Sequence, residues 1–408
     1  MNQLTSDKLR AYLFCGYGRF NDQLITELQP VNITSGFSRN VNGNISTINL
    51  REEIHDRFLQ SIKRSLDANF GKKHIVPLSG GLDSRFILAY LGRFVSPSEI
   101  FTFTFGIPNS LDYEIGNLIA KEYGTNHLSI DLTDEKNLNE IKNSMDFSAG
   151  FTNMNNLPPI SVLNNFVNLD ECLYWSGYMG DPLFGSHWPQ AGQLQFQDYL
   201  IKKEQNGIDF RGIPKFREAC IASFKREFDV DAVSSSVECE RWDLSYRQKY
   251  YVVPQIFFKG IEYATPFLSY EMLQLAGMLG ISDLNKSRLY HSFLSESDPV
   301  FKLPTKTYLG DPIALSSYKK VRYKFKKFIF GRSKGLRKKM LANYYGNLDF
   351  HKANLKTDYL EALDMLIDRR VGPTGAFEKA YLNYDKTFEN DSSLYGLCLG
   401  LSHGIRNA

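Results

Sequence analysis

A glycine pair that joins an apolar run to an amphipathic segment constrains this chain more than any other feature. Residues 74–77 (HIVP) lead into residues 78–84 (LSGGLDS), and residues 85–91 (RFILAYL) follow at once. That order predicts a strand, a tight turn and a helix. A helix N-terminus presents unpaired N–H groups and the positive end of a dipole, and adjacent glycines let the backbone approach an anion closely. The segment therefore predicts a phosphate-binding loop.

The side chains of this loop suit a nucleotide with its magnesium ion. Ser79 and Ser84 offer hydroxyl donors, and the Asp83 carboxylate can hold a Mg²⁺ that bridges phosphate oxygens. The chain contains neither the Gly-x-x-x-x-Gly-Lys-Ser/Thr loop of kinases and G proteins nor a Gly-x-Gly-x-x-Gly after a strand. The alternative is a turn that only joins strand to helix. The ATP contacts predicted in the loop are Leu78, Ser79, Gly80, Gly81, Asp83 and Ser84.

Strand and helix patterns alternate in the first half of the chain. Apolar positions four residues apart predict a helix over 51–70, and strands are predicted at 100–105 and 127–130 with a helix between them. Such alternation predicts an α/β fold, a parallel sheet with helices on both faces, whose ligand lies beyond the carboxyl ends of the strands. The α/β nucleotide-binding part is placed at 51–200, and a mainly helical part follows at 201–408.

Composition excludes several other classes of protein. The 408 residues are 43% hydrophobic and 23% charged, as in ordinary globular proteins, and a net charge of +3 excludes binding of polyanions over the whole surface. The five cysteines form no Cys-x-x-Cys pair, which argues against a disulfide framework or a zinc ribbon. No signal peptide and no run of about 18 apolar residues is present. The expected location is the cytoplasm.

Further segments follow the loop in the order of one family. Ser-Gly-Gly-x-Asp-Ser resembles the loop of the PP-loop ATP pyrophosphatases, and residues 104–127, 175–185, 264–268 and 303–308 resemble successive motifs of asparagine synthetases. The resemblance covers about residues 10–315. It implies an enzyme that adenylates a carboxylate with Mg-ATP, releases pyrophosphate, and forms an amide when ammonia or an amine displaces AMP.

The resemblance also implies roles for single residues. Asp83 and Asp181 are the expected Mg²⁺ ligands, and Lys306 would meet the α-phosphate or the leaving pyrophosphate as a catalytic residue. A turn residue is the alternative for Asp181, and an exposed surface lysine is the alternative for Lys306. The implied nucleotide contacts outside the loop are Phe105, Gly106 and Gly177.

The chain departs from glutamine-dependent asparagine synthetases at its beginning. Residue 2 is Asn, where those enzymes carry the catalytic Cys, and residues 1–50 resemble only the tail of a glutaminase domain. The remaining residues, 51–408, are predicted to be the synthetase domain. Nitrogen is therefore expected from free ammonia, from a separate glutaminase or from an amine of the substrate.

Two further departures concern the substrate. Tyr178 stands where the family has a Glu, as in β-lactam synthetases, in which a Tyr works with a Glu to deprotonate an amine. A phenol needs such help at neutral pH. Ser269 replaces an Asp and argues against ordinary asparagine synthesis. A packed aromatic under the loop is an equal alternative for Tyr178. Its candidate partners are Glu204, Glu218 and Glu227.

A basic segment at residues 318–340 carries eleven Lys and Arg and no acid. A helix of this kind can bury its apolar stripe on the protein, lie on an anionic membrane or contact nucleic acid. Burial of the apolar stripe on the protein is favoured first, then peripheral contact with the inner membrane surface, then RNA. The predicted function is an amide-forming ligase that acts on a glycan or small-molecule carboxylate. The alternatives are a PP-loop RNA-modifying enzyme and a non-catalytic partner protein.

Overall fold

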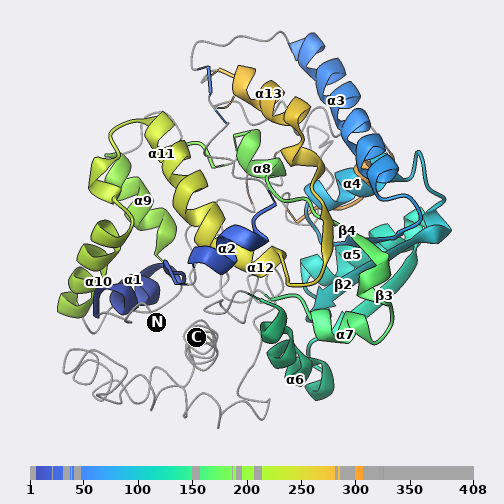
Figure 1. Ribbon diagram of the computed structural model, residues 1–408, viewed down its shortest axis with the longest axis horizontal. Coiled ribbons are helices and arrows are strands. Elements are labelled where there is room, and N and C mark those ends of the chain that lie inside the picture. Colours follow the sequence, from blue (N-terminus) through green and yellow to red (C-terminus); the bar gives the residue numbers. More distant parts are fainter. Residues whose placement is uncertain are drawn as a thin grey trace.

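A computed structural model of the chain shows an α/β fold built on five parallel strands (Figure 1). The strands are β1 Lys73–Pro77, β2 Ile100–Gly106, β3 Asn126–Asp131, β4 Cys172–Trp175 and β5 Glu262–Ala264. The structure describes residues 6–20, 22–30, 37, 39–40, 47–148, 157–185, 187–189, 195–205, 214–280, 284, 299–306, 321 and 325.

The order of the strands in the sheet is β3-β2-β1-β4-β5, and every pairing is parallel. The chain first runs outward from β1 to β2 and β3, then returns to the other side of β1 to add β4 and β5. The loops after β1 and β4 therefore lie side by side and diverge, which is the place where open α/β sheets bind ligands. The strands predicted near residues 74, 100 and 127 are confirmed, together with the parallel sheet.

Thirteen α-helices and one π-helix surround the sheet within the described ranges. The α-helices are α1 Ser6–Cys15, α2 Asp22–Leu28, α3 Thr47–Ala68, α4 Asp83–Leu91, α5 Leu111–Tyr123, α6 Glu135–Ser144, α7 Ile160–Asn164, α8 Gly180–Leu183, α9 Phe196–Glu204, α10 Pro214–Glu227, α11 Ser236–Trp242, α12 Val253–Ile256 and α13 Tyr270–Met278. The π-helix Asp243–Val252 joins α11 to α12 without a break. Short 3₁₀ turns include Pro266–Leu268 and Pro299–Lys302.

An aromatic cluster joins α3 and α4 to the turn that precedes α13. The ring of Phe58 lies 4.3 Å from Phe86 and 4.8 Å from Phe267, measured between centroids, and all three side chains are fully buried. Aromatic pairs at this spacing add about 1 kcal/mol each to the burial of their surface. The cluster thereby fixes the helix that begins at the phosphate-binding loop. Figure 1 shows α3 and α13 side by side above α4.

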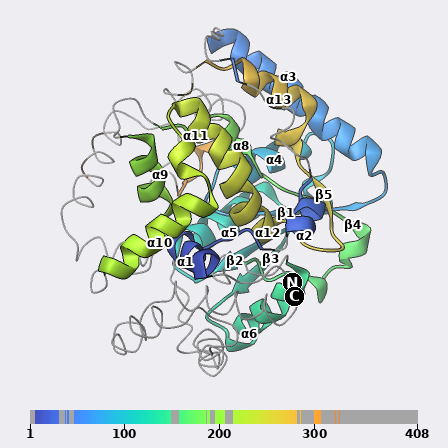
Figure 2. The same ribbon diagram turned by 60° about the vertical axis from the view of Figure 1, so that its left-hand side comes forward.

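The first described residues pack into the helical part of the molecule. Helix α1 lies against α10, with Phe14 at 4.9 Å from Phe224, and Tyr17 just beyond α1 lies 5.2 Å from Phe228. Figure 2 shows α1, α9, α10 and α11 grouped beside the sheet. The interpretation of residues 1–50 as the tail of a glutaminase domain stays a prediction.

Strand β5 comes from the part predicted as mainly helical and completes the sheet.

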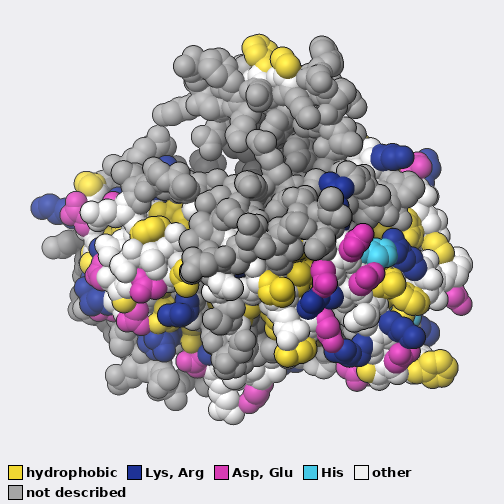
Figure 3. Space-filling view, turned by 90° about the horizontal axis from the view of Figure 1, so that it is seen from above, with side chains coloured by type: hydrophobic (Ala, Val, Ile, Leu, Met, Phe, Trp, Pro, Cys, Tyr) yellow, Lys and Arg dark blue, Asp and Glu magenta, His cyan; other side chains and the backbone are white. Residues whose placement is uncertain are grey.

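The surface and the cysteines agree with a globular protein. Cys15, Cys172, Cys220 and Cys239 are buried free thiols. Basic and acidic side chains are interspersed over the described part of the face in Figure 3. Among the described residues, no helix combines the length and the apolar character that crossing a membrane requires. Apart from the exposed side chains of Val321 and Phe325, the basic segment 318–340 lies outside the described residues.

Candidate active site

A cavity of about 520 Å³ lies beyond the carboxyl ends of the central strands. Its wall includes the loop after β1, Phe105 at the end of β2, the turn after β4, and residues of the π-helix and α12. This volume lies in the usual range for sites that bind small molecules. The cavity therefore occupies the position that the sheet topology predicts for a ligand.

The loop after β1 forms one wall of the cavity. The N–H of Leu78 donates to the carbonyl of Phe103 at 2.8 Å, and the Thr104 hydroxyl donates to the carbonyl of Leu78 at 3.0 Å, so the loop starts from a fixed point between β1 and β2. The buried Ser84 hydroxyl has no hydrogen-bond partner among the described residues. Its position in the first turn of α4 leaves it ready to donate to an anion. The predicted loop residues that line the cavity are Leu78, Ser79, Gly81, Asp83 and Ser84.

The turn after β4 interlocks with the loop through Asp83. The N–H of Asp181 donates to Asp83 Oδ2 at 3.2 Å. A Cβ atom at Gly180 would lie 2.6 Å from Asp83 Cγ, and one at Gly177 would lie 2.8 Å from Asp83 Cβ. Only glycine permits this approach of the backbone. The structure thus brings Asp83, Gly177 and Asp181 together on the cavity wall.

Asp83 and Asp181 are the two carboxylates predicted to hold magnesium together with phosphates, and both line the cavity. Mg²⁺ is usually held by one or two carboxylates together with substrate phosphates and water, rather than by a cage of protein ligands. The described residues contain no group of three or more His, Cys, Asp and Glu side chains that could hold a metal ion, and magnesium binding by Asp83 and Asp181 stays a prediction.

Lys306 contacts the loop beside the cavity rather than in its wall. Its backbone N–H donates to the carbonyl of Gly80 at 2.9 Å, and its ammonium group pairs with the Asp112 carboxylate. Asp112 in turn accepts a hydrogen bond of 3.1 Å from the N–H of Gly80. The contact between Asp112 and Lys306 therefore brings together two sequence motifs that lie almost 200 residues apart.

A buried arginine holds the segment that carries Lys306. Arg85 is fully buried, and its guanidinium donates to the carbonyls of Val300 at 3.2 Å and Pro304 at 2.9 Å. Burial lowers the pKa of Arg85 to about 10, so the group keeps its charge at neutral pH. Arg85 directly follows the predicted loop, and sequence reasoning gave it no role.

Some predicted contacts lie outside the cavity wall. Phe105 and Gly177 line the cavity, whereas Gly80, Gly106 and Lys306 do not. Gly106 ends β2 with a φ of 150°, a backbone conformation that favours glycine, and its carbonyl accepts the N–H of Leu132 at 2.9 Å. These contacts give Gly106 a structural role in joining β2 to the end of β3.

Tyr178 lines the cavity and is also packed. It is 4% exposed, and its ring meets Phe257 edge-on at 5.2 Å. Its hydroxyl has no hydrogen-bond partner among the described residues. Burial raises the pKa of Tyr178, and the negative charge of Asp243 raises it further, so the phenol stays protonated at neutral pH. No hydrogen bond between described residues joins Tyr178 to any of its three candidate partners, Glu204, Glu218 and Glu227.

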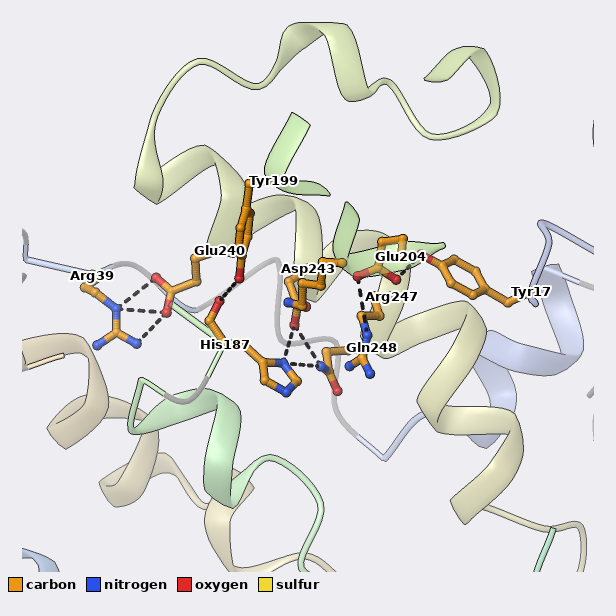
Figure 4. Close-up of polar contacts among 10 residues, drawn as sticks. Tyr17, Arg39, His187, Tyr199, Glu204, Glu240, Asp243, Arg247 and Gln248 are labelled. Carbon is orange, nitrogen blue, oxygen red and sulfur yellow. Dashed lines mark hydrogen bonds and ion pairs between the residues drawn. The ribbon is translucent and has the colours of Figure 1, made fainter. Parts of the chain in front are cut away.

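A polar cluster that the sequence did not reveal contributes His187 and Gln248 to another part of the wall (Figure 4). The buried Asp243 carboxylate pairs with His187 Nδ1 at 3.2 Å and with Lys203 Nζ at 2.8 Å, and accepts a hydrogen bond from Gln248 Nε2 at 2.8 Å. Burial opposes its ionisation, but the hydrogen bond with His187 and the charges of Lys203 and Arg247 outweigh burial. Together they hold the pKa of Asp243 well below its usual range.

A hydrogen bond and an ion pair of Glu204 connect this wall to the N-terminal segment. The Tyr17 hydroxyl donates to Glu204 Oε2 at 3.0 Å, and Glu204 Oε1 lies 3.6 Å from Arg247 Nε. Burial raises the pKa of Glu204, while the nearby charge of Arg247 acts to lower it. Figure 4 shows these contacts of Glu204 beside the cluster around Asp243. Glu204, one of the candidate partners of Tyr178, is thus engaged by Tyr17 and Arg247.

The π-helix explains why the sequence did not predict the polar cluster around Asp243. Its i→i+5 hydrogen bonds widen the turn, so that Asp243, Arg247 and Gln248 gather near one another, and such segments are frequent at functional sites. No residue type in positions 243–252 marks a π-helix. The one available signal was a run of charged and amide side chains between apolar positions.

The chain was compared with known proteins. Residues 53–214 match the family model described as asparagine synthase, whereas no curated protein matches the chain. The matched range begins inside α3 and contains the loop, the strands β1 to β4 and the turn with Asp181. It ends before the π-helix and before Lys306. Residues 53–214 are therefore similar to the synthetase domain of asparagine synthetases.

Proposed function

We propose that this protein adenylates a carboxylate substrate with Mg-ATP and then forms an amide when ammonia or an amine displaces AMP. One observation carries the proposal. The loop that follows β1 and the turn that follows β4 interlock at Asp83 and Asp181, and both line one cavity at the switch point of the sheet. That arrangement supports the binding of a nucleoside triphosphate beside a second substrate.

In this proposal the chain supplies both backbone and charged groups to the phosphates. The N–H groups of the loop and the Ser84 hydroxyl would donate to phosphate oxygens. Asp83 and Asp181 would hold Mg²⁺, which neutralises phosphate charge when it is bound. Lys306, fixed to Gly80 by its backbone, would place its ammonium group against the charge that develops as pyrophosphate leaves. Electrostatic stabilisation of this kind is usually the largest catalytic effect.

The identity of the carboxylate is a separate part of the proposal. We infer a glycan or small-metabolite carboxylate such as a uronic acid, and a nitrogen supply from free ammonia, a separate glutaminase or an amine. The side chains of Arg247, Gln248 and Gln255 line the cavity and support a polar substrate. A peripheral contact of residues 318–340 with an anionic membrane would suit a lipid-linked glycan. Co-sedimentation with phosphatidylglycerol vesicles, against neutral vesicles, tests that contact.

The experiment for the proposed reaction uses the full chain with Mg-ATP, ammonium chloride and a panel of carboxylates. The panel contains amino acids, uronic acids and N-acyl amino acids, and the readouts are AMP, pyrophosphate and the amide detected by mass spectrometry. AMP and pyrophosphate in equal amounts, dependent on one carboxylate, support the proposal. Release of ADP and phosphate, or no turnover with any carboxylate, contradicts it. The Asp83→Asn variant is the inactive control.

A further inference from the structure

His187 is the one histidine among the described residues that line the cavity. Its side chain is 27% exposed, and it follows α8, which carries Asp181. The Tyr199 hydroxyl donates to the backbone carbonyl of His187 at 3.3 Å, and the imidazole contacts Asp243. The ring is therefore held from both its backbone and its side chain, while it still faces the open volume of the site.

The contact with Asp243 assigns the protons of the imidazole. An ionised carboxylate accepts hydrogen bonds, so Nδ1 carries the proton and donates to Asp243. The nearby Gln248 amide lies 3.4 Å from Nδ1 but donates to the same carboxylate at 2.8 Å, which agrees with that assignment. In the neutral ring, Nε2 then carries a lone pair. The arrangement matches the general pattern of a base that is oriented by a carboxylate.

The other titratable groups of the cavity wall are poor candidates for a base. Asp83 and Asp181 are assigned to magnesium in the proposed function. Burial raises the pKa of both Tyr174 and Tyr178, so their phenolates are disfavoured. Arg247 keeps its proton because its pKa is raised by Glu204 and Asp243 against the effect of burial. His187 is left as the group whose Nε2 lone pair can accept a proton, because its Nδ1 contacts Asp243.

We propose that His187, oriented by Asp243, is the general base that takes a proton from the nitrogen nucleophile during amide formation. The inference rests on the proposed function. The nitrogen lone pair forms a bond to the acyl carbon of the adenylate, and the bond from that carbon to the phosphate oxygen breaks. AMP leaves with the electron pair of that bond. The proton lost by nitrogen moves to Nε2 and then to solvent, so that atoms and charge balance.

The test separates adenylation from the attack of nitrogen. Adenylation is measured as carboxylate-dependent exchange of labelled pyrophosphate into ATP, with the carboxylate that the panel identifies. Amide formation is measured with ammonium chloride and, in parallel, with hydroxylamine, which is largely unprotonated at neutral pH and reactive enough to attack an acyl adenylate without an enzymatic base, its proton passing to solvent. In His187→Asn and His187→Gln we expect exchange within about threefold of wild type, but at least about 100-fold less amide from ammonium. The yield of hydroxamate should recover to within a few-fold.

A matched control and the opposing outcomes complete the test. His55→Gln removes another partly buried histidine, which bonds the Tyr90 hydroxyl at 2.7 Å outside the cavity, and should change no step by more than about twofold. Equal losses with ammonium and hydroxylamine, loss of exchange, or unchanged amide formation in both His187 variants would overturn the inference. Absence of exchange in the wild-type protein is a different result, because it refutes the proposed function and removes this inference with it.

Discussion

The two ends of the cavity are built on different principles. At the end proposed to bind the nucleotide, called the nucleotide end below, short segments after β1 and β4 meet through backbone groups, and glycines at 177 and 180 allow the contact with Asp83. At the other end, side chains from the π-helix Asp243–Val252, from α9 and from His187 form a buried polar network. The first end depends on local chain conformation, and the second depends on tertiary contacts.

This difference suggests a division of labour. Every nucleotide presents the same phosphates, so a backbone cradle fixed by a few residues serves any carboxylate substrate. Within the network of side chains, the π-helix residues lie outside the matched family range, whereas His187 and Lys203 lie inside it. Substitutions at the first end should therefore affect every step that involves ATP, whereas substitutions at the second should affect stability and the second half-reaction.

The largest expected effect is at the nucleotide end. Lys306→Met removes the ammonium group beside Gly80 and should lower pyrophosphate release about 1,000-fold, equivalent to about 4 kcal/mol of transition-state stabilisation. The matched control is Lys302→Met, an exposed lysine in the turn Pro299–Lys302 of the same segment. Steady-state release of pyrophosphate measures both. Near-native turnover in Lys306→Met would remove the lysine from the proposed reaction.

The second prediction concerns the polar network around Asp243 and how its contribution to stability changes with pH. Hydrogen bonding by His187 and the charge of Lys203 outweigh burial and hold the pKa of Asp243 below its ordinary value of 3.8. The stabilisation from this carboxylate is therefore fully present above about pH 4, and is lost as the pH falls toward the folded-state pKa. Asp243→Asn should lower the free energy of unfolding by about 3 kcal/mol at pH 7, because it leaves buried charges without a partner.

Urea unfolding at several pH values measures the effect of Asp243→Asn. The difference between wild type and variant should narrow below about pH 4, since only the wild type then loses stabilisation from this carboxylate. Asp231→Asn is the control, because the Asp231 pair with Lys225 at 2.7 Å is exposed and should contribute less than about 1 kcal/mol. A constant difference at all pH values would contradict the role given to the charge of Asp243.

Sequence reasoning could predict the loop after β1 because its geometry follows from local residue order. A strand, two glycines and a helix start can be recognised without tertiary information, and the sheet topology then places Asp83 and Asp181 side by side. The roles assigned to Lys306 and Tyr178 stay predictions, although the structure locates one beside the loop and the other in the cavity wall.

The other end was not predictable from the same sequence. Asp243, His187 and Lys203 come from three segments that share no pattern, and their contact depends on how α9, the π-helix and the segment after α8 pack. Strand β5 was missed for a related reason, because its three residues are too short to show an alternation of apolar and polar positions. Burial of Arg85 was equally hidden, since arginine is normally a surface residue.

The third effect tests how closely the backbone must approach Asp83. In Gly180→Ala, the new Cβ would lie 2.6 Å from Asp83 Cγ, so the turn and the carboxylate must move apart. We expect a loss of about 2 kcal/mol in the free energy of unfolding, as for other overpacked sites, together with weaker binding of Mg-ATP. Calorimetry measures the binding.

Gly71→Ala supplies the matched control for that substitution. Gly71 has a φ of 86° and open space around it, so the variant should lose about 1 kcal/mol through backbone strain alone and bind Mg-ATP normally. Equal binding by both variants would show that the contact between the two motifs is not needed for the nucleotide.

The smallest effect concerns the link between the N-terminal segment and the second end. Tyr17→Phe removes the hydrogen bond of 3.0 Å to the buried Glu204 and should cost about 1 kcal/mol of unfolding free energy. Since Glu204 also pairs with Arg247 in the cavity wall, the variant should raise the KM for the carboxylate while the KM for ATP stays unchanged. Tyr246→Phe, which removes an exposed bond to Asp229, is the control. If Tyr17→Phe raised both KM values together, the two ends would be coupled, and the division between a backbone cradle and an independent wall of side chains would fail.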